Sequence, residues 1–246
     1  MIIVLAGAAG SGKDTIGDLL VASHGFVKDA FASPLKAMVR MAFPAFDDND
    51  IYGPSSRRET QYPQYPFTGI CLGCGTACHD AKAFVGGLDV AWWKNPEKNR
   101  YHCENCEIDY PEFISPRIAL QTLGTEWGRR LFPPIWVDAA FARIRRETEE
   151  YGRSTFNPGV ELDYIITDCR FKNEIEGSKK NGGIVVRLTR NKNNNTSAHA
   201  SEAELRSLPD SMFDYIFDNE KMALEELPVE VGGMLRDLKR MTKEKT

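Results

Sequence analysis

The sequence predicts an α/β fold in which a parallel sheet of about five strands carries helices on both faces. Short apolar runs with the length of buried strands recur along the chain, and helical patterns separate them. This alternation is typical of parallel sheets, because each crossover helix covers one face of the sheet. The strands are expected at residues 2–6, 164–167, 184–188 and 215–217, with a weaker one at 26–31.

Composition and charge narrow the class of protein. The 246 residues suffice for one substantial α/β domain with an insertion, and 42% hydrophobic and 27% charged residues are ordinary for a globular protein. The net charge of −4 argues against general nucleic-acid binding. No apolar run approaches the roughly 20 residues of a membrane span, and the first residues lack the basic region of a signal peptide. We therefore expect a cytoplasmic protein with no membrane partner and no direct nucleic-acid partner.

A glycine-rich loop with the spacing G-x-x-x-x-G-K follows the first expected strand. Glycines let the backbone curl around phosphate oxygens, its N–H groups point inward, and the positive end of the next helix adds to the attraction. The lysine reaches the β- and γ-phosphates of a nucleotide, so the loop predicts ATP binding. An aspartate stands where such P-loops carry Ser or Thr, and a threonine comes one place later. The loop consists of Gly7, Ala8, Ala9, Gly10, Ser11, Gly12, Lys13, Asp14 and Thr15.

The strand at residues 164–167 ends on a carboxylate, Asp168. In P-loop enzymes an acid at such a strand end holds Mg²⁺, directly or through water. The alternative is a helix cap or turn residue, since aspartate favours both. Thr15 and Asp168 are therefore the candidate Mg²⁺ ligands. Arg170 follows closely and either clamps a transferred phosphoryl group or forms a surface ion pair.

A helix is expected from residue 115 to about 131, with Ser115 as its N-cap and Pro116 in its first turn. Gly124 and Gly128 inside the helix each cost about 1 kcal/mol relative to alanine, so a backbone or a ligand must approach closely there. An apolar stripe expected in the core consists of Leu120, Leu123, Trp127 and Leu131. A polar ridge, which is either a solvated face or part of a ligand site, consists of Arg117, Gln121, Thr125 and Arg129.

The stretch from about residue 43 to residue 116 breaks the alternation and is rich in Pro, Gly, Tyr and Cys. Two C-x-x-C motifs within it predict a tetrahedral structural Zn²⁺ site of the ribbon type, although the loop between them is longer than the usual ~15–20 residues. Free thiols, a disulfide or an iron–sulfur site are the alternatives, and three nearby side chains, Cys78, His79 and His102, are spare ligands. The predicted zinc ligands are Cys71, Cys74, Cys103 and Cys106.

Two adjacent arginines, Arg57 and Arg58, follow a Tyr-Gly-Pro-Ser-Ser loop in the same stretch. Adjacent arginines in such a loop suit recognition of a second phosphate, because the guanidinium fork matches phosphate oxygens. They equally suit a surface charge pair.

Seven segments, in order along the chain, carry a resemblance to a known family. They are G-A-A-G-S-G-K-D-T (7–15), F-A-S-P-L-K (31–36), Y-G-P-S-S-R-R-E (52–59), S-P-R-I-A-L-Q-T-L-G-T-E-W-G-R (115–129), T-D-C-R-F-K-N-E (167–174), H-A-S-E (199–202) and F-D-Y-I-F-D-N (213–219). Together they resemble the deoxynucleoside monophosphate kinases of bacteriophages, a branch of the P-loop nucleoside monophosphate kinases. The segment L-Q-T-L-G-T-E-W-G-R is the most specific of them.

The resemblance implies a P-loop kinase fold and a reaction. The family transfers the γ-phosphoryl group of ATP, with Mg²⁺, to a deoxynucleoside 5′-monophosphate, which here would serve phage DNA synthesis in the host cytoplasm. The implied catalytic residues are Lys13, Arg129, Asp168 and Arg170. The implied acceptor-binding residues are Lys36, Arg57, Arg58, Arg117, Gln121 and Arg129. Residues 7–15 and Arg190 are implied for the ATP site.

The break in the alternation and the cysteine motifs divide the chain into a P-loop kinase core at residues 1–42 and 115–246, a substrate-binding excursion at 43–70 and a zinc-ribbon-like insertion at 71–114. A homodimer is compatible with this division. A zinc-ribbon ATPase that binds nucleic acid is an alternative, but it predicts a basic chain, and this one is acidic. A P-loop kinase of another small phosphorylated acceptor is a second alternative, which residues 115–129 disfavour.

Overall fold

The computed structural model describes residues 1–8, 10–53, 55–63, 92–95, 100–103, 108–111, 113–153, 159, 161–189, 200–220 and 222–244. The chain forms two compact units, residues 1–35 with 124–246 and residues 36–123. The predicted finer division, with limits at residues 42, 70 and 114, stays a prediction. In the described part of the chain, no helix is both long and apolar enough to cross a bilayer.

The first unit is built on a five-stranded parallel sheet, as the alternation of strands and helices predicts. Its strand order is β10-β9-β1-β8-β2, and every neighbouring pair is parallel. The predicted strand at residues 26–31 is present but shorter. The strands are β1 (Ile2–Ala6), β2 (Val27–Asp29), β8 (Tyr164–Cys169), β9 (Ile184–Leu188) and β10 (Tyr215–Phe217).

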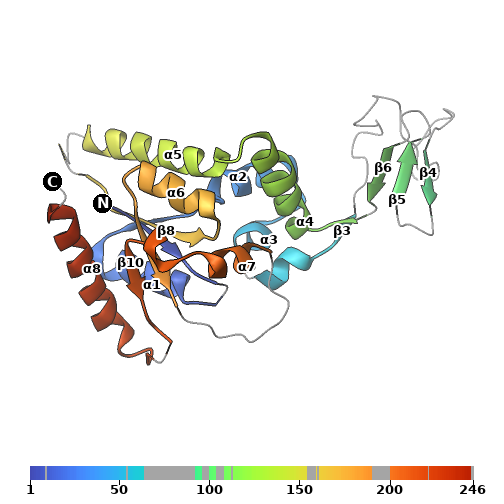
Figure 1. Cartoon of the computed structure of the whole chain (residues 1–246). Coiled ribbons are helices and arrows are strands. Elements are labelled where there is room, and N and C mark those ends of the chain that lie inside the picture. The colour runs from blue at the N-terminus through green and yellow to red at the C-terminus, as the bar shows by residue number, and fades with distance from the viewer. Residues whose placement is uncertain are drawn as a thin grey trace. The chain divides into compact units, whose positions relative to one another are not determined.

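Helices cover both faces of this sheet (Figure 1). On one face, Ile3 and Leu5 of β1 are fully buried in a cluster with Ile16 of α1 and Met234 of α8. On the other face lie α5 and α6, and Phe141 of α5 is buried there. The helices of this unit are α1 (Lys13–His24), α5 (Ile135–Gly152), α6 (Lys172–Lys180), α7 (Ala200–Ser207) and α8 (Leu227–Glu244), with a 3-10 turn, η3 (Asp210–Met212).

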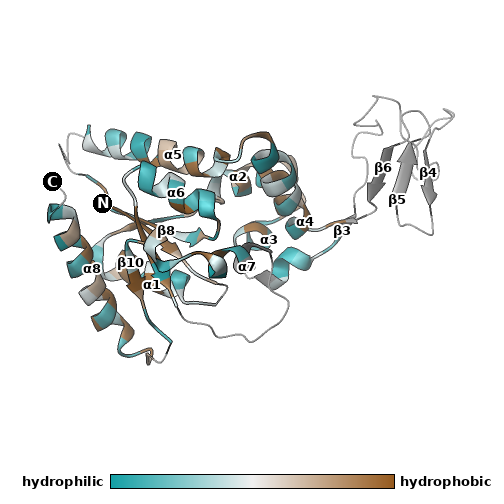
Figure 2. Ribbon diagram, viewed as in Figure 1, coloured by the Kyte–Doolittle hydropathy of each residue, from teal (hydrophilic) through white to brown (hydrophobic). Residues whose placement is uncertain are grey.

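Burial on both faces explains why the strands read as apolar runs in the sequence. Hydrophobic residues concentrate in the strands of the sheet, whereas the outer surfaces of α5 and α8 carry many hydrophilic ones (Figure 2). In a parallel sheet the carboxyl ends of neighbouring strands lie at one edge, which is where ligands of such folds bind. The P-loop, residues 7–15, follows β1 at this edge.

The second unit combines short helices with two small antiparallel sheets. One sheet pairs β3 with β7, and the other has the order β4-β5-β6. The strands are β3 (Tyr62–Pro63), β4 (Trp92–Asn95), β5 (Arg100–Cys103), β6 (Ile108–Pro111) and β7 (Phe113–Ile114). The helices are α2 (Ser33–Ala42), which begins in the first unit, α3 (Asp48–Tyr52), η1 (Ser55–Glu59) and α4 (Pro116–Gln121).

The predicted zinc ligands fall mostly outside the described residues. Cys103 ends β5 in the three-stranded sheet, whereas Cys71, Cys74 and Cys106 lie outside the described ranges. Within those ranges, no group of three or more His, Cys, Asp or Glu side chains is arranged to hold a metal ion. The zinc-ribbon-like insertion therefore stays a prediction.

The helix predicted from residue 115 to about 131 is present, but its type changes along its length. As predicted, Ser115 caps it: its Oγ accepts from the N–H of Ile118 at 3.3 Å, and Pro116 follows in the first turn. After α4 the backbone continues as a π-helix, η2 (Thr122–Arg129).

The prediction that the apolar stripe of this helix is buried in the core is wrong for two of its four residues. Trp127 is 46% exposed and Leu131 is 70% exposed, whereas Leu120 and Leu123 are half-buried. A π-helix bonds residue i to residue i+5 and has a wider turn than an α-helix, so residues four apart no longer share a face. The sequence pattern assumed α-helical spacing throughout.

Candidate functional site

The P-loop turns from β1 into α1 through glycines in a left-handed conformation. Gly10 has φ of 74° and Gly12 has φ of 94°, values that residues with a side chain rarely adopt. Gly12 is also the N-cap of α1, so the positive end of the helix dipole lies at the loop. Ala9 lies outside the described residues, and Thr15 is exposed on the first turn of α1.

The side chain of Lys13 folds back into the loop. Its Nζ donates to the carbonyl oxygens of Gly7 and Ala8, both at 2.7 Å, and lies 3.4 Å from Ser11 Oγ. Burial, reinforced by the positive charge of Arg170, lowers the pKa of Lys13 from 10.5 to about 8. A bound phosphate would supply the negative charge that this buried ammonium group lacks.

Asp14, which replaces the usual hydroxyl residue of the P-loop, ties α1 to its neighbours. Its Oδ1 lies 3.2 Å from Nζ of Lys28 and accepts from Oγ1 of Thr167 at 3.2 Å. Burial acts to raise the pKa of Asp14, but the hydrogen bond and the charge of Lys28 outweigh it, so the pKa lies below 3.8. Asp14 is therefore a charged residue that links α1 to β2 and β8.

The carboxylate of Asp168 lies at the end of β8, where the sequence places it, and binds backbone. Its Oδ1 accepts from the N–H of Phe31 at 2.8 Å, and its Oδ2 accepts from the N–H of Ala32 at 3.0 Å. These two residues connect β2 to α2, so Asp168 fixes the turn between them. The Mg²⁺ role of Asp168 stays a prediction.

A buried carboxylate, Glu174, binds the side chain of one predicted catalytic arginine, Arg129, and the backbone of another, Arg170. Its Oε1 accepts from Arg129 Nη2 at 2.6 Å, and its Oε2 accepts from the backbone N–H groups of Arg170 at 2.7 Å and Phe171 at 3.1 Å. The guanidinium carbon of Arg129 also lies 3.7 Å from the centroid of the Phe171 ring. Burial raises the pKa of Glu174 to about 7, although the charge of Arg129 acts in the opposite direction. The sequence alone assigns Glu174 no role, and the signals for it are its place in the matched segment 167–174 and its closeness to Asp168.

A second residue that the sequence analysis missed is Asn219, which follows β10. Its Nδ2 donates to the carbonyl oxygen of Ser11 at 3.0 Å, and the side chain is 2% exposed. A Cβ on Gly12 would lie only 3.1 Å from the same nitrogen, so Asn219 packs directly against the P-loop. Its Oδ1 is buried and has no hydrogen-bond partner among the described residues.

The predicted acceptor-binding arginines of the second unit are paired with carboxylates. Arg57 forms ion pairs with Asp47 at 3.2 Å and with the fully buried Asp50 at 3.1 Å. Arg117 pairs with Glu59. A phosphate that bound Arg57 or Arg117 would either displace these carboxylates or share the guanidinium group with them.

The remaining predicted acceptor-binding residues of this unit are Lys36 on α2, Arg58 on η1 and Gln121 on α4. Arg58 donates to the carbonyl oxygen of Gly53 at 3.4 Å, and Nζ of Lys36 lies 5.5 Å from the centroid of the Tyr52 ring. Gln121 is exposed at the end of α4. Arg190, predicted for the ATP site, lies outside the described residues.

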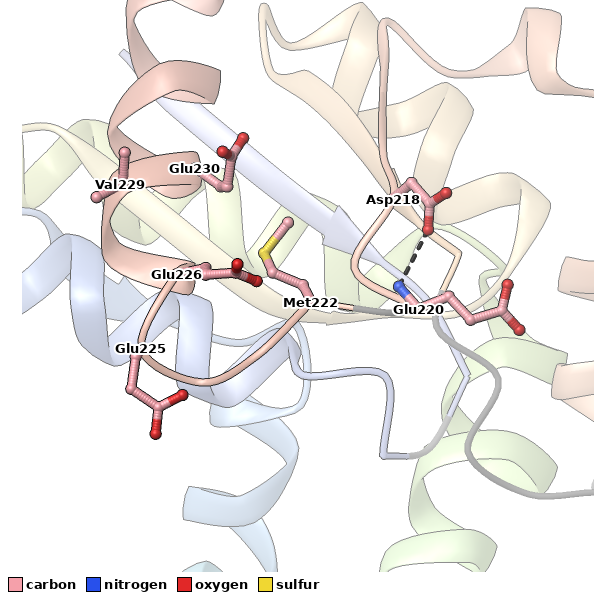
Figure 3. A pocket seen from close by; sticks show the side chains of 7 residues that line it. All are labelled: Asp218, Glu220, Met222, Glu225, Glu226, Val229 and Glu230. Carbon is pink, nitrogen blue, oxygen red and sulfur yellow. Dashed lines mark hydrogen bonds between the residues drawn. The ribbon is translucent and has the colours of Figure 1, made fainter.

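A cavity of about 630 Å³ lies between the end of β10 and the start of α8 (Figure 3). Most of its lining side chains are carboxylates, so its negative field repels a triphosphate. Within the cavity wall, the backbone N–H of Glu220 donates to Asp218 at 3.0 Å. The lining residues are Asp218, Glu220, Met222, Glu225, Glu226, Val229 and Glu230.

The sequence of this chain is similar to those of two viral proteins. No protein-family model matches it. It is 24% identical over 221 residues to a protein named putative deoxynucleotide monophosphate kinase from Acanthamoeba polyphaga mimivirus, covering 90% of this chain and 89% of that protein. It is 25% identical over an alignment of 251 residues to the deoxynucleotide monophosphate kinase of Enterobacteria phage T4, covering 96% and 99%. The chain is thus similar over nearly its whole length to viral deoxynucleotide monophosphate kinases, which confirms the resemblance found in its sequence.

Proposed function

We propose that the protein transfers the γ-phosphoryl group of ATP to a deoxynucleoside 5′-monophosphate, giving ADP and the deoxynucleoside diphosphate. The observation that carries this proposal is the P-loop with its buried Lys13, in a chain that is similar over nearly its whole length to viral proteins named deoxynucleotide monophosphate kinases. Because those relatives are viral, we propose that the product serves viral DNA synthesis in the host cytoplasm.

The proposed reaction needs positioning and charge neutralisation more than covalent chemistry. The attacking oxygen belongs to a phosphate, which is already an anion, so no strong general base is required. The N–H groups of the P-loop and Lys13 would hold the β- and γ-phosphates, with Lys13 exchanging its carbonyl partners for phosphate oxygens. Arg129 and Arg170 would neutralise the charge on the transferred group.

Mg²⁺ accompanies ATP in reactions of this kind and neutralises the charge of the β- and γ-phosphates. The proposed protein ligands are Thr15 and Asp168. The oxygens of Asp168 accept the backbone N–H groups of Phe31 and Ala32, which orients this carboxylate near the carboxyl end of β8. The donor set is of the oxygen type that Mg²⁺ prefers.

We propose that the acceptor phosphate and base are bound by six polar side chains, most of them arginines. Guanidinium groups suit this role, because they bind phosphate oxygens with two parallel hydrogen bonds. The existing carboxylate partners of Arg57 and Arg117 would hold these side chains extended before the acceptor arrives. The proposed residues are Lys36, Arg57, Arg58, Arg117, Gln121 and Arg129.

We also propose one structural Zn²⁺ bound by Cys71, Cys74, Cys103 and Cys106. In support, Cys103 stands at the end of a short antiparallel strand, with the second cysteine of its C-x-x-C motif three residues later. Four thiolates would close the site, so the metal would stabilise the fold and take no part in phosphoryl transfer.

The test is incubation of the purified protein with ATP, Mg²⁺ and each common deoxynucleoside monophosphate singly, with diphosphates quantified by chromatography. Diphosphate from one or more acceptors supports the proposal and reveals the base preference. ATP hydrolysis without a phosphorylated acceptor would favour the ATPase alternative. Lys13→Ala is expected to abolish transfer in a folded protein, and near-normal turnover in that variant would refute the assignment of the ATP site.

A further inference from the structure

We infer that Glu174 is a positioning residue, which holds the guanidinium of Arg129 in place for phosphoryl transfer. The inference rests on the proposed function and deepens it, because it gives a buried carboxylate a role in the reaction through Arg129. Glu174 lies on the first turn of α6, at the end of the loop that follows β8.

The carboxylate of Glu174 is fixed from both of its oxygens. Oε2 accepts two backbone N–H groups, those of Arg170 and Phe171, at the start of α6. Oε1 accepts from Arg129 at 2.6 Å, which is short for an N–H···O bond and typical of a charge-assisted one. Rotation of the carboxylate would break all three bonds, so its orientation is set by the backbone.

Arg129 is held on a second side by the ring of Phe171. The guanidinium carbon lies 3.7 Å from the ring centroid, which is a cation–π geometry. Within the described part of the chain, its guanidinium makes no other hydrogen bond than that to Glu174, and the side chain stays 22% exposed. The arginine is therefore fixed in orientation and still presents donors to a ligand.

The pair formed by Arg129 and Glu174 is linked to the P-loop through Arg170. Glu174 binds the backbone of Arg170, whose positive charge contributes to the lowered pKa of Lys13. The carboxylate of Glu174 thus links Arg129, at the end of the π-helix, with Arg170, in the loop after β8. Arg170 is the second candidate catalytic arginine, and its charge acts on Lys13 of the P-loop. All of these residues belong to the first unit.

A purely structural ion pair is the competing interpretation. A buried salt bridge is an expensive way to stabilise a fold, because the desolvation of both charges offsets their attraction, and an apolar pair often does as well. A fixed charged acceptor, by contrast, suits directional control of an arginine that acts on a phosphoryl group, because charge-assisted hydrogen bonds are short and strong. The two interpretations differ in what removal of the carboxylate charge does to turnover in protein that is still folded.

The first test compares Glu174→Gln with Glu176→Gln in the diphosphate assay. Glu176 lies on the same helix, but its side chain is 58% exposed and pairs only loosely with Lys172, at 3.6 Å. Glutamine keeps an acceptor for the backbone N–H groups and turns an amide NH₂ toward Arg129. We expect Glu174→Gln to lower kcat about 100-fold through misplacement of the arginine. The KM for ATP should stay within about threefold, and Glu176→Gln should match the wild type.

The second test is a double-mutant cycle with Arg129→Ala. If Glu174 acts through Arg129, the double variant is expected to be no more than about threefold slower than Arg129→Ala alone. Independent, multiplying losses would overturn the inference, and so would a normal kcat in folded Glu174→Gln. If Glu174→Gln does not fold, Glu174→Asp takes its place; it keeps the charge but withdraws the carboxylate by one methylene. A normal kcat in Glu174→Asp would likewise refute the positioning role.

The wild-type protein separates this inference from the proposed function. Absence of diphosphate with every acceptor would refute the proposed function itself. Wild-type activity combined with unaffected turnover in the Glu174 variants would refute the positioning role alone.

Discussion

Binding of ATP above pH 8 is expected to take up a proton at Lys13. In the ligand-free protein this ammonium group is buried against carbonyl oxygens, and its pKa falls from 10.5 to about 8. The triphosphate brings several negative charges to the same place, so the pKa of Lys13 should return toward its ordinary value when ATP binds. The change in pKa then appears as proton uptake.

The size of the uptake follows from the two pKa values. At pH 8.5 about three quarters of Lys13 is neutral in the free protein, and nearly all of it is charged in the complex, so about 0.7 proton is taken up per ATP. At pH 6.5 the lysine is charged in both states and the uptake should be close to zero. By the same linkage the dissociation constant for ATP should weaken about 30-fold between pH 7 and pH 9.5.

Isothermal titration calorimetry with Mg²⁺ and ATP measures this directly. Titrations at one pH in buffers of different ionisation enthalpy give the number of protons exchanged from the slope of the observed heat. Lys13→Arg is the matched control, because a guanidinium stays charged over this pH range and should bind ATP without uptake. Wild-type uptake below about 0.2 proton at pH 8.5, or equal uptake in Lys13→Arg, would refute the argument.

Three further predictions test packing, the P-loop and the metal. Gly124→Ala should lower the free energy of unfolding by about 1–2 kcal/mol in urea titrations, because the new Cβ would lie 2.7 Å from Cδ2 of buried Leu35. Gly232→Ala, whose Cβ would meet nothing closer than 3.7 Å, should be neutral or stabilising, and equal losses in both would contradict the explanation. Asn219→Ala should raise the KM for ATP about fivefold by freeing a P-loop carbonyl, and an unchanged KM would remove Asn219 from the site. Strong chelation should expose residues 71–106 to limited proteolysis, whereas an unchanged digestion pattern would count against structural zinc.

Features that depend on residues close together in the sequence could be predicted from the sequence alone. The apolar runs became the five parallel strands, and Ser115 caps its helix as its residue type and place indicate. The P-loop glycines stand where the backbone needs positive φ, at Gly10 and Gly12. Such features follow from propensity, periodicity and backbone sterics, which act over a few residues.

The course of the helix after Gln121 could not be predicted in the same way. The sequence pattern gave α-helical spacing to Trp127 and Leu131, yet Trp127, inside the π-helix, and Leu131, two residues after its end, are both exposed. The close approach expected at Gly124 is real, but its cause is a packed side chain, Leu35, together with the indole N–H of Trp136, which donates to the Gly124 carbonyl at 2.8 Å. Neither partner can be identified from the helix sequence, because both come from other elements of the fold.

The sequence by itself determined the sheet, the P-loop and the family resemblance, because each rests on local order along the chain. Only the tertiary structure decided what the polar side chains around the P-loop contact. Glu174 reaches Arg129 across 45 positions, Asn219 reaches Ser11 across 208, and Asp168 reaches Phe31 across 137. The bonds of Asn219 and Asp168 exist because parallel strands bring their carboxyl ends to one edge, where residues distant in sequence become neighbours. The bond of Glu174 exists because the π-helix ends beside the start of α6.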